Sequence, residues 1–264
     1  WATWYPGAEP GGGGYVAQPL RYYESNVVKT VRLLHYLCAR GCDRFVFSSS
    51  GSVYASAAGG PVAEDAPLAP TSPYARTKAM VEQVLADAAE SSRGAIRAMS
   101  LRYFNPVGAD PRLRSGQQRA SHTLVLSKLL QAHQSGTPFT ITGTDWPTRD
   151  GSAIRDYVHV WDVARAHVCA LERFDAVMAD GRHHEILNVG TGNGTTVREL
   201  LAMFDEAIGG GLQVADGPSR PGDALGCYAV VDRIRELLGW SAELTIAQGI
   251  RDALAWDARR DEVL

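Results

Sequence analysis

The sequence lacks an excess of charge of either sign, since 26 basic residues stand against 29 acidic ones and the formal net charge is −3. This balance gives no electrostatic reason to expect binding to nucleic acid or to an anionic membrane. The sequence also has no apolar run near the roughly 20 residues that a membrane-spanning helix needs. Its beginning has neither the basic region nor the apolar stretch of a signal peptide. We therefore expect a cytoplasmic protein without a nucleic-acid or membrane partner.

Cysteine is scarce, with four residues in the whole chain. Only Cys38 and Cys42 are close in sequence, and their spacing suits one face at the end of a helix. No neighbouring cysteine or histidine completes a zinc-binding set, so the sequence predicts no metal site. Reduced thiols agree with a cytoplasmic location.

The composition of the chain is typical of a globular protein, with 45% hydrophobic and 21% charged residues among 264. This length allows one large domain or two small ones. The first residue is Trp1 rather than methionine, and several prolines and the glycine run at 11–14 follow it. We therefore expect residues 1–20 to form a loop and the natural start of the protein to be missing.

Apolar periodicity predicts helices that alternate with buried strands in the first part of the chain. Helical spacing is present at 21–39, which ends before Gly41, and again at 74–89. Short apolar runs at 44–48 and 96–104 are typical of strands. This alternation predicts an α/β fold with a parallel sheet, in which ligands bind beyond the carboxyl ends of the strands.

Polar residues follow both predicted strands, with the serines 48–50 after the first and Asn105 after the second. The serines could bind a ligand there or simply satisfy the backbone groups at the strand end. Asp162 is predicted to cap the helix that runs to about Leu171. Further helices are predicted at 124–133, 196–208 and 245–258, and further strands at 139–142, 156–160 and 186–189.

Tyr74 and Lys78 are the best chemical lead in the sequence. On a helix, Lys78 falls one turn after Tyr74 on the same face. An ammonium group near a phenol favours the phenolate and lowers its pKa from the usual value of about 10. A tyrosine tuned in this way can take a proton from a sugar alcohol and return it. The alternative is an aromatic side chain at the start of a helix that packs on Pro73.

Several motifs occur in a fixed order along the chain. They are Ser-Ser-Ser-Gly-Ser-Val-Tyr at 48–54, Tyr74-x-x-x-Lys78, Arg-Tyr-Phe-Asn-Pro-Val-Gly-Ala at 102–109, Asp-Gly-x-x-x-Arg-Asp-Tyr-Val-His-Val at 150–160 and Leu-Asn-Val-Gly-Thr-Gly at 187–192. Together they resemble the UDP-glucose (UDP-galactose) 4-epimerase family of extended short-chain dehydrogenase/reductases. The resemblance extends from about Pro19 to Trp256.

The resemblance implies a Rossmann-like parallel sheet, truncated at its N-terminal end, with a smaller α/β substrate-binding domain. The NAD-binding domain would comprise residues 1–106, with 154–172 returning to it. The UDP-sugar-binding domain would comprise residues 107–264. A homodimer that pairs through the helices at 27–37 and 74–89 is implied as well.

The resemblance also implies roles for the chemical groups around Tyr74. Tyr74 would act as base and acid at the sugar 4-hydroxyl, and Lys78 would hold the nicotinamide ribose and lower the pKa of Tyr74. Ser50 would hydrogen-bond the same hydroxyl. Hydride would pass from sugar C4 to NAD, and the 4-keto intermediate would turn over in the pocket and take the hydride back on its other face.

Binding residues are implied in the same way. The residues near the nicotinamide half of NAD would be Asn26, Ser48, Tyr74, Lys78 and Phe104. The residues that bind the UDP-sugar would be Ser50, Asn105, Leu124, Thr140, Arg155, Arg220, Asp223 and Cys227. The forked donors of arginine suit a pyrophosphate, and a cysteine beside the sugar 2-substituent leaves room for an N-acetyl group. UDP-GlcNAc and UDP-GalNAc are therefore expected as substrates in addition to UDP-glucose and UDP-galactose.

The sequence departs from the family pattern at its beginning, where a strand, a Gly-x-x-Gly-x-x-Gly turn and a helix should hold the NAD pyrophosphate. The run at Gly11–Gly14 is not preceded by a strand, and Val16 stands where the third glycine belongs. A non-catalytic remnant that binds UDP-sugars is therefore an alternative. A UDP-glucuronate or UDP-pentose 4-epimerase is another, whereas Gly51-Ser52 disfavours a dehydratase, which would carry Asp-Glu.

Two histidines and a stretch near 190 remain to be assigned. His159 and His167 suit structural roles better than catalytic ones. Asn188 and the glycine-rich stretch 190–194 could bind a ligand or could form a turn.

Overall fold

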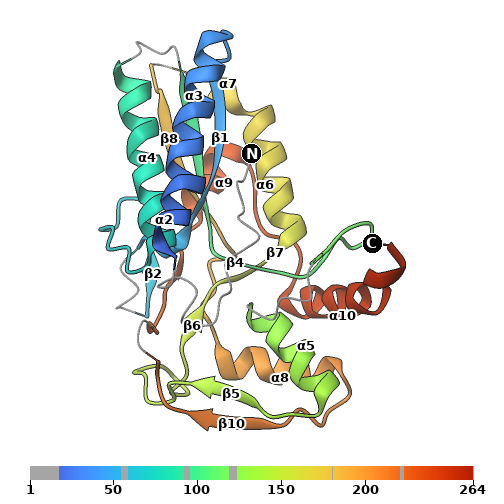
Figure 1. Cartoon of the computed structure of the whole chain (residues 1–264). Helices are drawn as coiled ribbons and strands as arrows, with labels where there is room; N and C mark the ends of the chain where they lie inside the picture. The colour runs from blue at the N-terminus through green and yellow to red at the C-terminus, as the bar shows by residue number, and fades with distance from the viewer. Residues whose placement is uncertain are drawn as a thin grey trace.

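The computed structural model describes residues 18–54, 59–91, 96–118, 124–179, 181–220 and 223–263. The glycine run at 11–14, for which the sequence predicts a loop, lies outside these residues. Figure 1 shows the whole chain, with the larger sheet and its helices above and a smaller group of helices and strands below.

Three parallel strands form the larger sheet, which confirms the predicted fold class. β1 (Arg44–Ser50) pairs with β3 (Arg97–Tyr103), and β3 pairs with β8 (His184–Val189). Ser50 lies opposite Tyr103, and Tyr103 lies opposite Val189. The carboxyl ends of all three strands therefore meet at one edge of the sheet, as expected for ligand binding.

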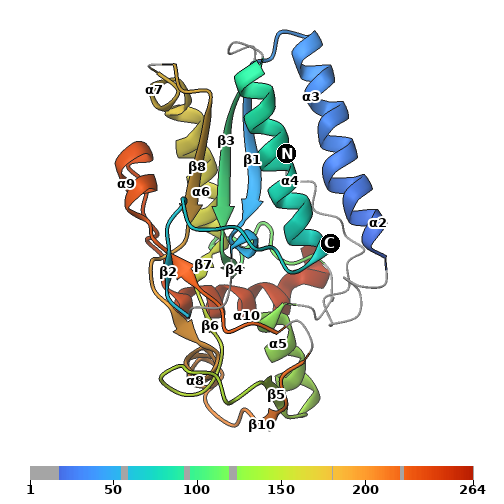
Figure 2. The ribbon, with the colours of Figure 1, turned by 90° about the vertical axis from the view of Figure 1, so that its left-hand side faces the viewer.

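Helices cover both faces of this sheet. The helical stretch that comprises α2 (Pro19–Tyr22), the π-helix η1 (Tyr23–Val28) and α3 (Lys29–Ala39) lies beside α4 (Pro73–Ser91), while α6 (Val160–Glu172) covers the opposite face (Figure 2). Side chains of a strand alternate between faces. Phe45 and Phe47 therefore pack with Leu85 of α4, whereas Val46 packs with the cluster on the α6 side.

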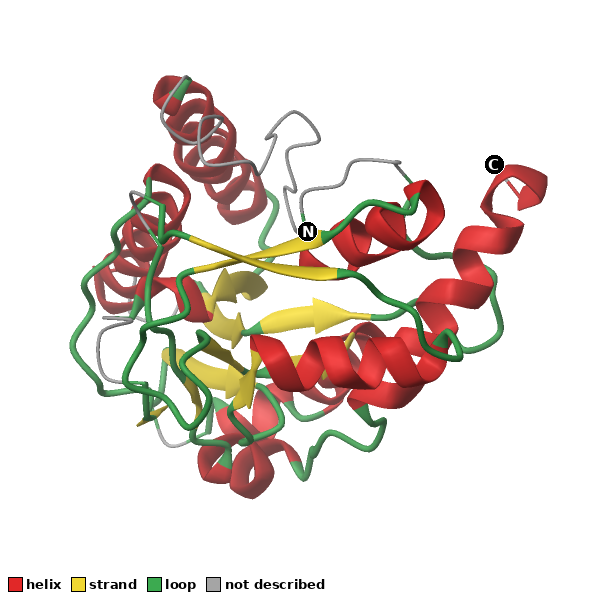
Figure 3. Ribbon diagram, turned by 90° about the horizontal axis from the view of Figure 1, so that it is seen from below, coloured by secondary structure: helices red, strands yellow, loops and turns green. Residues whose placement is uncertain are grey.

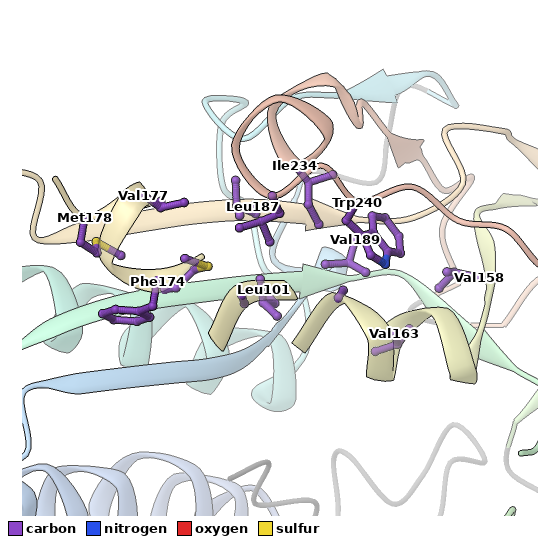
Figure 4. Packing of buried hydrophobic residues seen from close by; sticks show 14 residues of the cluster. Leu101, Val158, Val163, Phe174, Val177, Met178, Leu187, Val189, Ile234 and Trp240 are labelled. Atoms are coloured by element: carbon purple, nitrogen blue, oxygen red, sulfur yellow. The ribbon is translucent and has the colours of Figure 1, made fainter. Parts of the chain in front are cut away.

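The cluster on the α6 side is the largest part of the core. Leu101 of β3 and Leu187 of β8 pack with Val163 of α6, and α7 (Phe174–Val177) and α9 (Asp232–Leu238) close the cluster (Figure 4). Trp240 is buried at its end, and its indole N–H donates to the Asp162 carbonyl at 3.1 Å.

A second group of elements lies below the carboxyl edge of the sheet in Figures 1 and 2 and nearest the viewer in Figure 3, which is seen from below. It comprises α5 (Val125–Ser135), β5 (Phe139–Thr142), α8 (Val197–Ala207), β10 (Val214–Gly217) and α10 (Ile246–Val263). Leu129, Phe204 and Ile250 come from three of these helices and share one buried cluster. Thr196 caps α8 in a reciprocal pair with Glu199.

Short strand pairs connect the two groups. β4 (Asn105–Val107) pairs with β7 (Tyr157–His159), β6 (Ile154–Arg155) with β9 (Thr195–Thr196), and β2 (Pro61–Val62) with β11 (Tyr228–Ala229). β8 joins the larger sheet and α9 packs in the core cluster beside it, although both lie beyond the segment 154–172 that was expected to return there. The division into domains at residue 106 stays a prediction.

The prediction that Asp162 caps α6 is wrong. The capping residue is His159, whose Nδ1 accepts a hydrogen bond from the Trp161 N–H at 3.0 Å. Asp162 lies inside the first turn and accepts from the N–H groups of Glu243 and Leu244 at 3.0 and 2.8 Å. The carboxylate therefore fixes the chain before α10, a contact that no local pattern in the sequence reveals.

Candidate active site

Tyr74 and Lys78 lie on the first turns of α4, as their spacing predicts. Pro73 begins the helix, and the Ser72 hydroxyl accepts a hydrogen bond from the Ala75 N–H at 3.1 Å. The Nζ atom of Lys78 lies 5.5 Å from the centroid of the Tyr74 ring. The helix start thus brings the ammonium group and the phenol together at the carboxyl edge of the sheet.

Lys78 is almost completely buried, with 4% of its surface exposed. Its Nζ donates to the backbone carbonyl of Ser48 at 2.8 Å and lies 5.0 Å from the centroid of the Phe47 ring. Burial lowers the pKa of Lys78 to about 8, although the negative charge of Glu82 acts in the opposite direction. The side chain is therefore fixed in position and carries a proton that it gives up more easily than an exposed lysine does.

Ser48 and Ser50 lie at the end of β1 with different partners. The Ser50 hydroxyl accepts from the Ser52 N–H at 3.2 Å and lies 2.9 Å from the Ser52 hydroxyl. The Ser48 hydroxyl lies 3.1 Å from Nε2 of His167. Since Nδ1 of His167 lies 2.8 Å from the Val163 carbonyl, which can only accept, the proton of the neutral ring is on Nδ1 and Ser48 donates to Nε2. His167 thus fixes a predicted cofactor residue from the far face of the sheet.

Asn26 lies in η1, the π-helical turn between α2 and α3. Its side chain is buried, and its Nδ2 donates to the Thr77 hydroxyl of α4 at 3.0 Å. Its Oδ1 is buried and has no hydrogen-bond partner among the described residues. Buried acceptors are nearly always paired, so this oxygen is available to a donor from a ligand.

Phe104 and Cys227 belong to one small buried cluster with Val53, Tyr54 and Ala229. The rings of Phe104 and Tyr54 are stacked, with centroids 6.3 Å apart and planes at 25°. Cys227 is 7% exposed, and burial raises the pKa of its thiol. Cys227, distant in sequence from the other residues, is thus brought against the chain that follows Ser50.

Arg155 lies on β6, where its charge acts on the Cys227 thiol, but its guanidinium is held by the backbone. Its Nη atoms donate to the carbonyls of Ile154, Leu225 and Ala224 at 2.6, 3.0 and 3.1 Å. Gly226 makes this approach possible because a Cβ there would lie 1.9 Å from the Ile154 oxygen, and its φ is +104°. The side chain of Asn105, on the neighbouring β4, is exposed.

The other predicted UDP-binding residues lie in the second group of elements and are exposed. Leu124 precedes α5 and is 54% exposed, and Thr140 is exposed on β5. The Arg220 N–H donates to the Asp223 carboxylate at 2.8 Å. Burial and the charge of Arg220 lower the pKa of Lys128 on α5, against the effect of Asp223.

Lys128 therefore lies close to two predicted binding residues, and sequence reasoning missed it. It belongs to an ordinary amphipathic helix, in which a lysine carries no signal of function. Glu82 and Arg102 were missed as well. Their signals are available in retrospect, because Glu82 follows Lys78 by one helical turn and Arg102 opens one of the motifs.

A cavity in the described part of the chain is lined by none of the predicted site residues. The cavity has a volume of about 370 Å³ and is lined by Gly59, Pro147, Thr148, Arg149, Ile154, Gly192, Asn193, Gly194 and Tyr228.

No group of three or more His, Cys, Asp or Glu side chains that could hold a metal occurs in the part of the chain that the structure covers. Likewise, none of the described helices has the length and apolar character needed to cross a membrane. The four cysteines are free thiols.

Sequence comparison identifies relatives along nearly the whole chain. Residues 5–190 match the NAD dependent epimerase/dehydratase family. UDP-glucose 4-epimerase 2 of Arabidopsis thaliana is 38% identical over 246 residues, which cover 92% of this chain and 69% of the relative. UDP-glucose 4-epimerase of Azospirillum brasilense is 40% identical over 244 residues, which cover 92% and 68%. UDP-glucose 4-epimerase 2 of Oryza sativa is 38% identical, with 94% of this chain and only 60% of the relative covered.

Solved structures agree with these relatives. The UDP-glucose 4-epimerase of Stenotrophomonas maltophila, with bound NAD and formylated UDP-arabinopyranose, has a TM-score of 0.86 at 34% identity. The match covers 96% of this chain and 74% of that one. The enzyme of Bifidobacterium longum, in complex with NAD+ and UDP, has a TM-score of 0.85 at 32% identity with the same coverage. The chain described here belongs to the NAD dependent epimerase/dehydratase family.

Proposed function

We propose that the protein interconverts UDP-glucose and UDP-galactose in an NAD-dependent reaction at sugar C4. The observation that carries this proposal is that Lys78 lies against the Tyr74 ring and donates to the Ser48 carbonyl near the end of β1, the strand that Ser50 terminates. The identity of about 38% with UDP-glucose 4-epimerases supports the choice of reaction. The chain spans 60% to 69% of the length of the three curated relatives described above, so the activity of the whole protein is part of the proposal.

Tyr74 takes the proton from the sugar 4-hydroxyl and returns it at the end of the reaction. The ammonium group of Lys78, 5.5 Å from the ring, stabilises the phenolate by Coulomb attraction. The hydroxyl of Ser50 orients the sugar hydroxyl by a hydrogen bond. Because Lys78 and Ser48 are held by backbone and side-chain partners, these groups keep their positions before a substrate arrives.

NAD, when bound, supplies the acceptor and the donor of hydride in this reaction. The residues of the described part fit its nicotinamide half. The buried Oδ1 of Asn26 is available to an amide or hydroxyl donor. Lys78 lies on the adjacent helix α4, and Ser48 lies near the end of β1. Phe104 would form an apolar wall beside the ring. The glycine run 11–14 lies outside the described residues, so no contact to the phosphates of NAD enters the proposal.

The UDP half is proposed to bind between the strand ends and the second group of elements. Arg155 and Arg220 would face the pyrophosphate, with Asn105 as an additional donor. Asp223 would accept from a ribose hydroxyl. Leu124 and Thr140 complete the proposed set on α5 and β5.

Cys227 is proposed to border the sugar 2-substituent. A small side chain at this buried position leaves space that a tyrosine would fill. We therefore include UDP-GlcNAc and UDP-GalNAc among the proposed substrates.

We also propose a homodimer formed through α3 and α4. Both helices carry exposed apolar side chains, with Tyr36 57% and Met80 44% exposed. A cytoplasmic location is proposed as well, and the four free thiols agree with it.

Separate titrations with NAD and with UDP test the proposed function. We expect isothermal titration calorimetry to detect both ligands, and an absorbance scan of the purified protein to reveal any retained cofactor. Arg220→Ala should weaken UDP binding, while the control Arg198→Ala, an exposed arginine of α8, should not. Binding of UDP without NAD would overturn the proposed redox chemistry, and binding of neither ligand would overturn the proposed function.

A further inference from the structure

A buried ion pair connects the helix that carries Lys78 to the strand that leads into Phe104. Glu82 lies on α4 one turn after Lys78, and Arg102 lies on β3 two residues before Phe104. Nε and Nη2 of Arg102 donate to the two carboxylate oxygens of Glu82 at 2.9 and 2.6 Å. The side chain of Arg102 is only 3% exposed, and that of Glu82 only 4%.

The ion pair extends to three other segments of the chain. The Ser49 hydroxyl of β1 donates to the Glu82 carboxylate. Nη1 of Arg102 donates to the Tyr54 oxygen at 2.8 Å and to the Glu64 carbonyl at 3.0 Å. Nearly all of the donors of this guanidinium are therefore used, in a geometry that a lysine could not reproduce.

These contacts fix the direction of every hydrogen bond at Tyr54. Arginine can only donate, so the Tyr54 oxygen accepts from Arg102 and gives its own proton to Oδ1 of Asn188 at 2.7 Å. Burial raises the pKa of Tyr54 to about 12, so the phenol keeps that proton. The guanidinium also lies 4.8 Å from the centroid of the Tyr54 ring. The ring is thus locked in one orientation.

Tyr54 in turn supports a wall formed by Phe104, proposed to lie beside the nicotinamide ring, and Cys227, proposed to lie beside the sugar. Its ring stacks on Phe104, and both pack with Cys227 in the same buried cluster. The Phe104 ring also lies against Gly51, where an added Cβ would approach it to 3.1 Å. A change in the tilt of Tyr54 would therefore reach Phe104, Cys227 and the turn that follows Ser50.

A buried ion pair is a poor way to gain stability, because two charges must lose their hydration. Apolar side chains of similar size would serve folding as well. What the pair adds is a fixed orientation, because the forked donors of Arg102 hold the Glu82 carboxylate and the Tyr54 phenol together. The same network assigns a role to Asn188, which the sequence left open between ligand binding and a turn. Its Oδ1 accepts the hydrogen bond from Tyr54.

We propose that Glu82 and Arg102 are positioning residues that orient Tyr54 and thereby hold the Phe104–Cys227 wall of the proposed site. The identity of the ligand beside this wall rests on the proposed function. The packing of the wall does not, so the two can be tested separately.

Two variants remove the contacts without leaving an unpaired charge. The double variant Glu82→Leu/Arg102→Met replaces the ion pair by apolar side chains and is expected to fold. Tyr54→Phe removes only the hydroxyl and keeps the ring. The matched control is Ser100→Ala, since Ser100 is buried on β3, two residues before Arg102, and lies 3.0 Å from Nε2 of His184.

The first measurement needs no ligand. In a background of Cys38→Ser, Cys42→Ser and Cys169→Ser, Cys227 is the only thiol, and its rate of reaction with a disulfide reagent reports how tightly the wall is packed. We expect the rate to rise roughly tenfold in the double variant and in Tyr54→Phe, in keeping with the loss of a buried hydrogen bond. It should not change in Ser100→Ala. Equal rates in all proteins would overturn the positioning role.

The second measurement compares the dissociation constants of UDP-glucose and UDP by calorimetry. The ratio of the two constants should change about tenfold in the double variant, because UDP-glucose carries the sugar proposed to lie beside Cys227 and UDP does not. A purely structural role would weaken both ligands alike and leave the ratio unchanged, which would overturn the proposal. If the parent protein binds neither ligand, the proposed function is wrong, and the thiol rates still decide whether the network holds the wall.

Discussion

The two halves of the proposed site differ in how their side chains are held. At the edge of the larger sheet, Asn26, Ser48 and Lys78 are 3%, 3% and 4% exposed and have fixed partners. In the second group of elements, Leu124 is 54% exposed, and Arg220 is exposed as well. The proposed chemical groups are thus placed by the fold, whereas the exposed side chains proposed to contact the ligand in the second group are not.

The difference teaches where binding energy is used in such a site. A buried group has already lost its conformational freedom during folding, so it can act on a substrate without further ordering. An exposed side chain loses that freedom only when the ligand binds, which reduces the affinity that it contributes. Changes at the sheet edge should therefore affect turnover and stability, and changes in the second group should affect ligand affinity.

Tyr74→Phe should give the largest effect. Loss of the proton-transfer group should lower kcat by about 10²–10⁴-fold, with the dissociation constant of UDP unchanged. Arg220→Ala should do the reverse and weaken UDP with little change in kcat. Turnover assays and calorimetry on both variants check this difference, and a Tyr74→Phe variant that loses UDP affinity instead would contradict it.

Glu82→Ala should follow in size. The substitution leaves the guanidinium of Arg102 buried and unpaired, which should lower the free energy of unfolding by about 3–5 kcal/mol. Arg198→Ala breaks an ion pair with Asp216 in the second group, where the side chains are 37% and 55% exposed. That loss should stay below about 1 kcal/mol. Denaturant unfolding of both variants measures the loss in the free energy of unfolding. Similar losses in Glu82→Ala and Arg198→Ala would contradict the difference between the two regions.

The stability of the parent protein relative to Lys78→Met should depend on pH. The pKa of Lys78 is about 8 in the folded protein and has its usual value of 10.5 in the unfolded chain. Between these pH values the unfolded chain binds more protons, so the free energy of unfolding of the parent rises with pH relative to the variant. The total rise should be about 3 kcal/mol. Unfolding in denaturant at pH 7 to 10.5 measures it.

Lys128→Met is the matched comparison in the second group. The pKa of Lys128 is lowered as well, by burial and by Arg220, but its side chain is only partly buried. The pH dependence should therefore have the same sign and a smaller size. A larger effect for Lys128 than for Lys78 would reverse the contrast between the regions.

Cys227→Tyr should give the smallest effect, confined to substrate choice. The larger ring should lower turnover of UDP-GlcNAc by about tenfold, as expected for filling a pocket that accepts a small extra group. Turnover of UDP-glucose should change little. Thermal unfolding of the variant shows whether the buried position tolerates the ring, and an equal loss on both sugars would count against the proposed specificity.

Much of the fold was predictable because its elements have strong local patterns. The strands predicted at 44–48 and 96–104 correspond to β1 and β3, and the helices predicted at 74–89 and 124–133 correspond to α4 and α5. β6, β9 and β11 were not predicted, since two residues are too few to carry a period. The sequence predicted that Asp162 caps α6, because an aspartate near a helix start is a common cap. Its actual partners, the N–H groups of Glu243 and Leu244, are too far away in sequence to be predicted.

The candidate site divides in the same way. The spacing of Tyr74 and Lys78 predicted one helical face, and the structure confirms it. The roles proposed for these residues are still predictions. The neighbour Lys128 could not be identified from sequence, because it resembles an ordinary charged residue on an amphipathic helix. Arg102 opens one of the motifs, but nothing in the sequence shows which residues it contacts.

The sequence by itself determined the local elements, the position of Tyr74 and Lys78 on one helix, and the membership of the family, because all of these depend on short spacings and ordered motifs. Only the tertiary structure decided that Arg102 meets Glu82 and Tyr54 and that Tyr54 meets Asn188. These contacts join residues 20, 48 and 134 positions apart. They form only after the strands have paired and excluded water. A buried charge or phenol that has lost its hydration needs a hydrogen-bond partner within the protein.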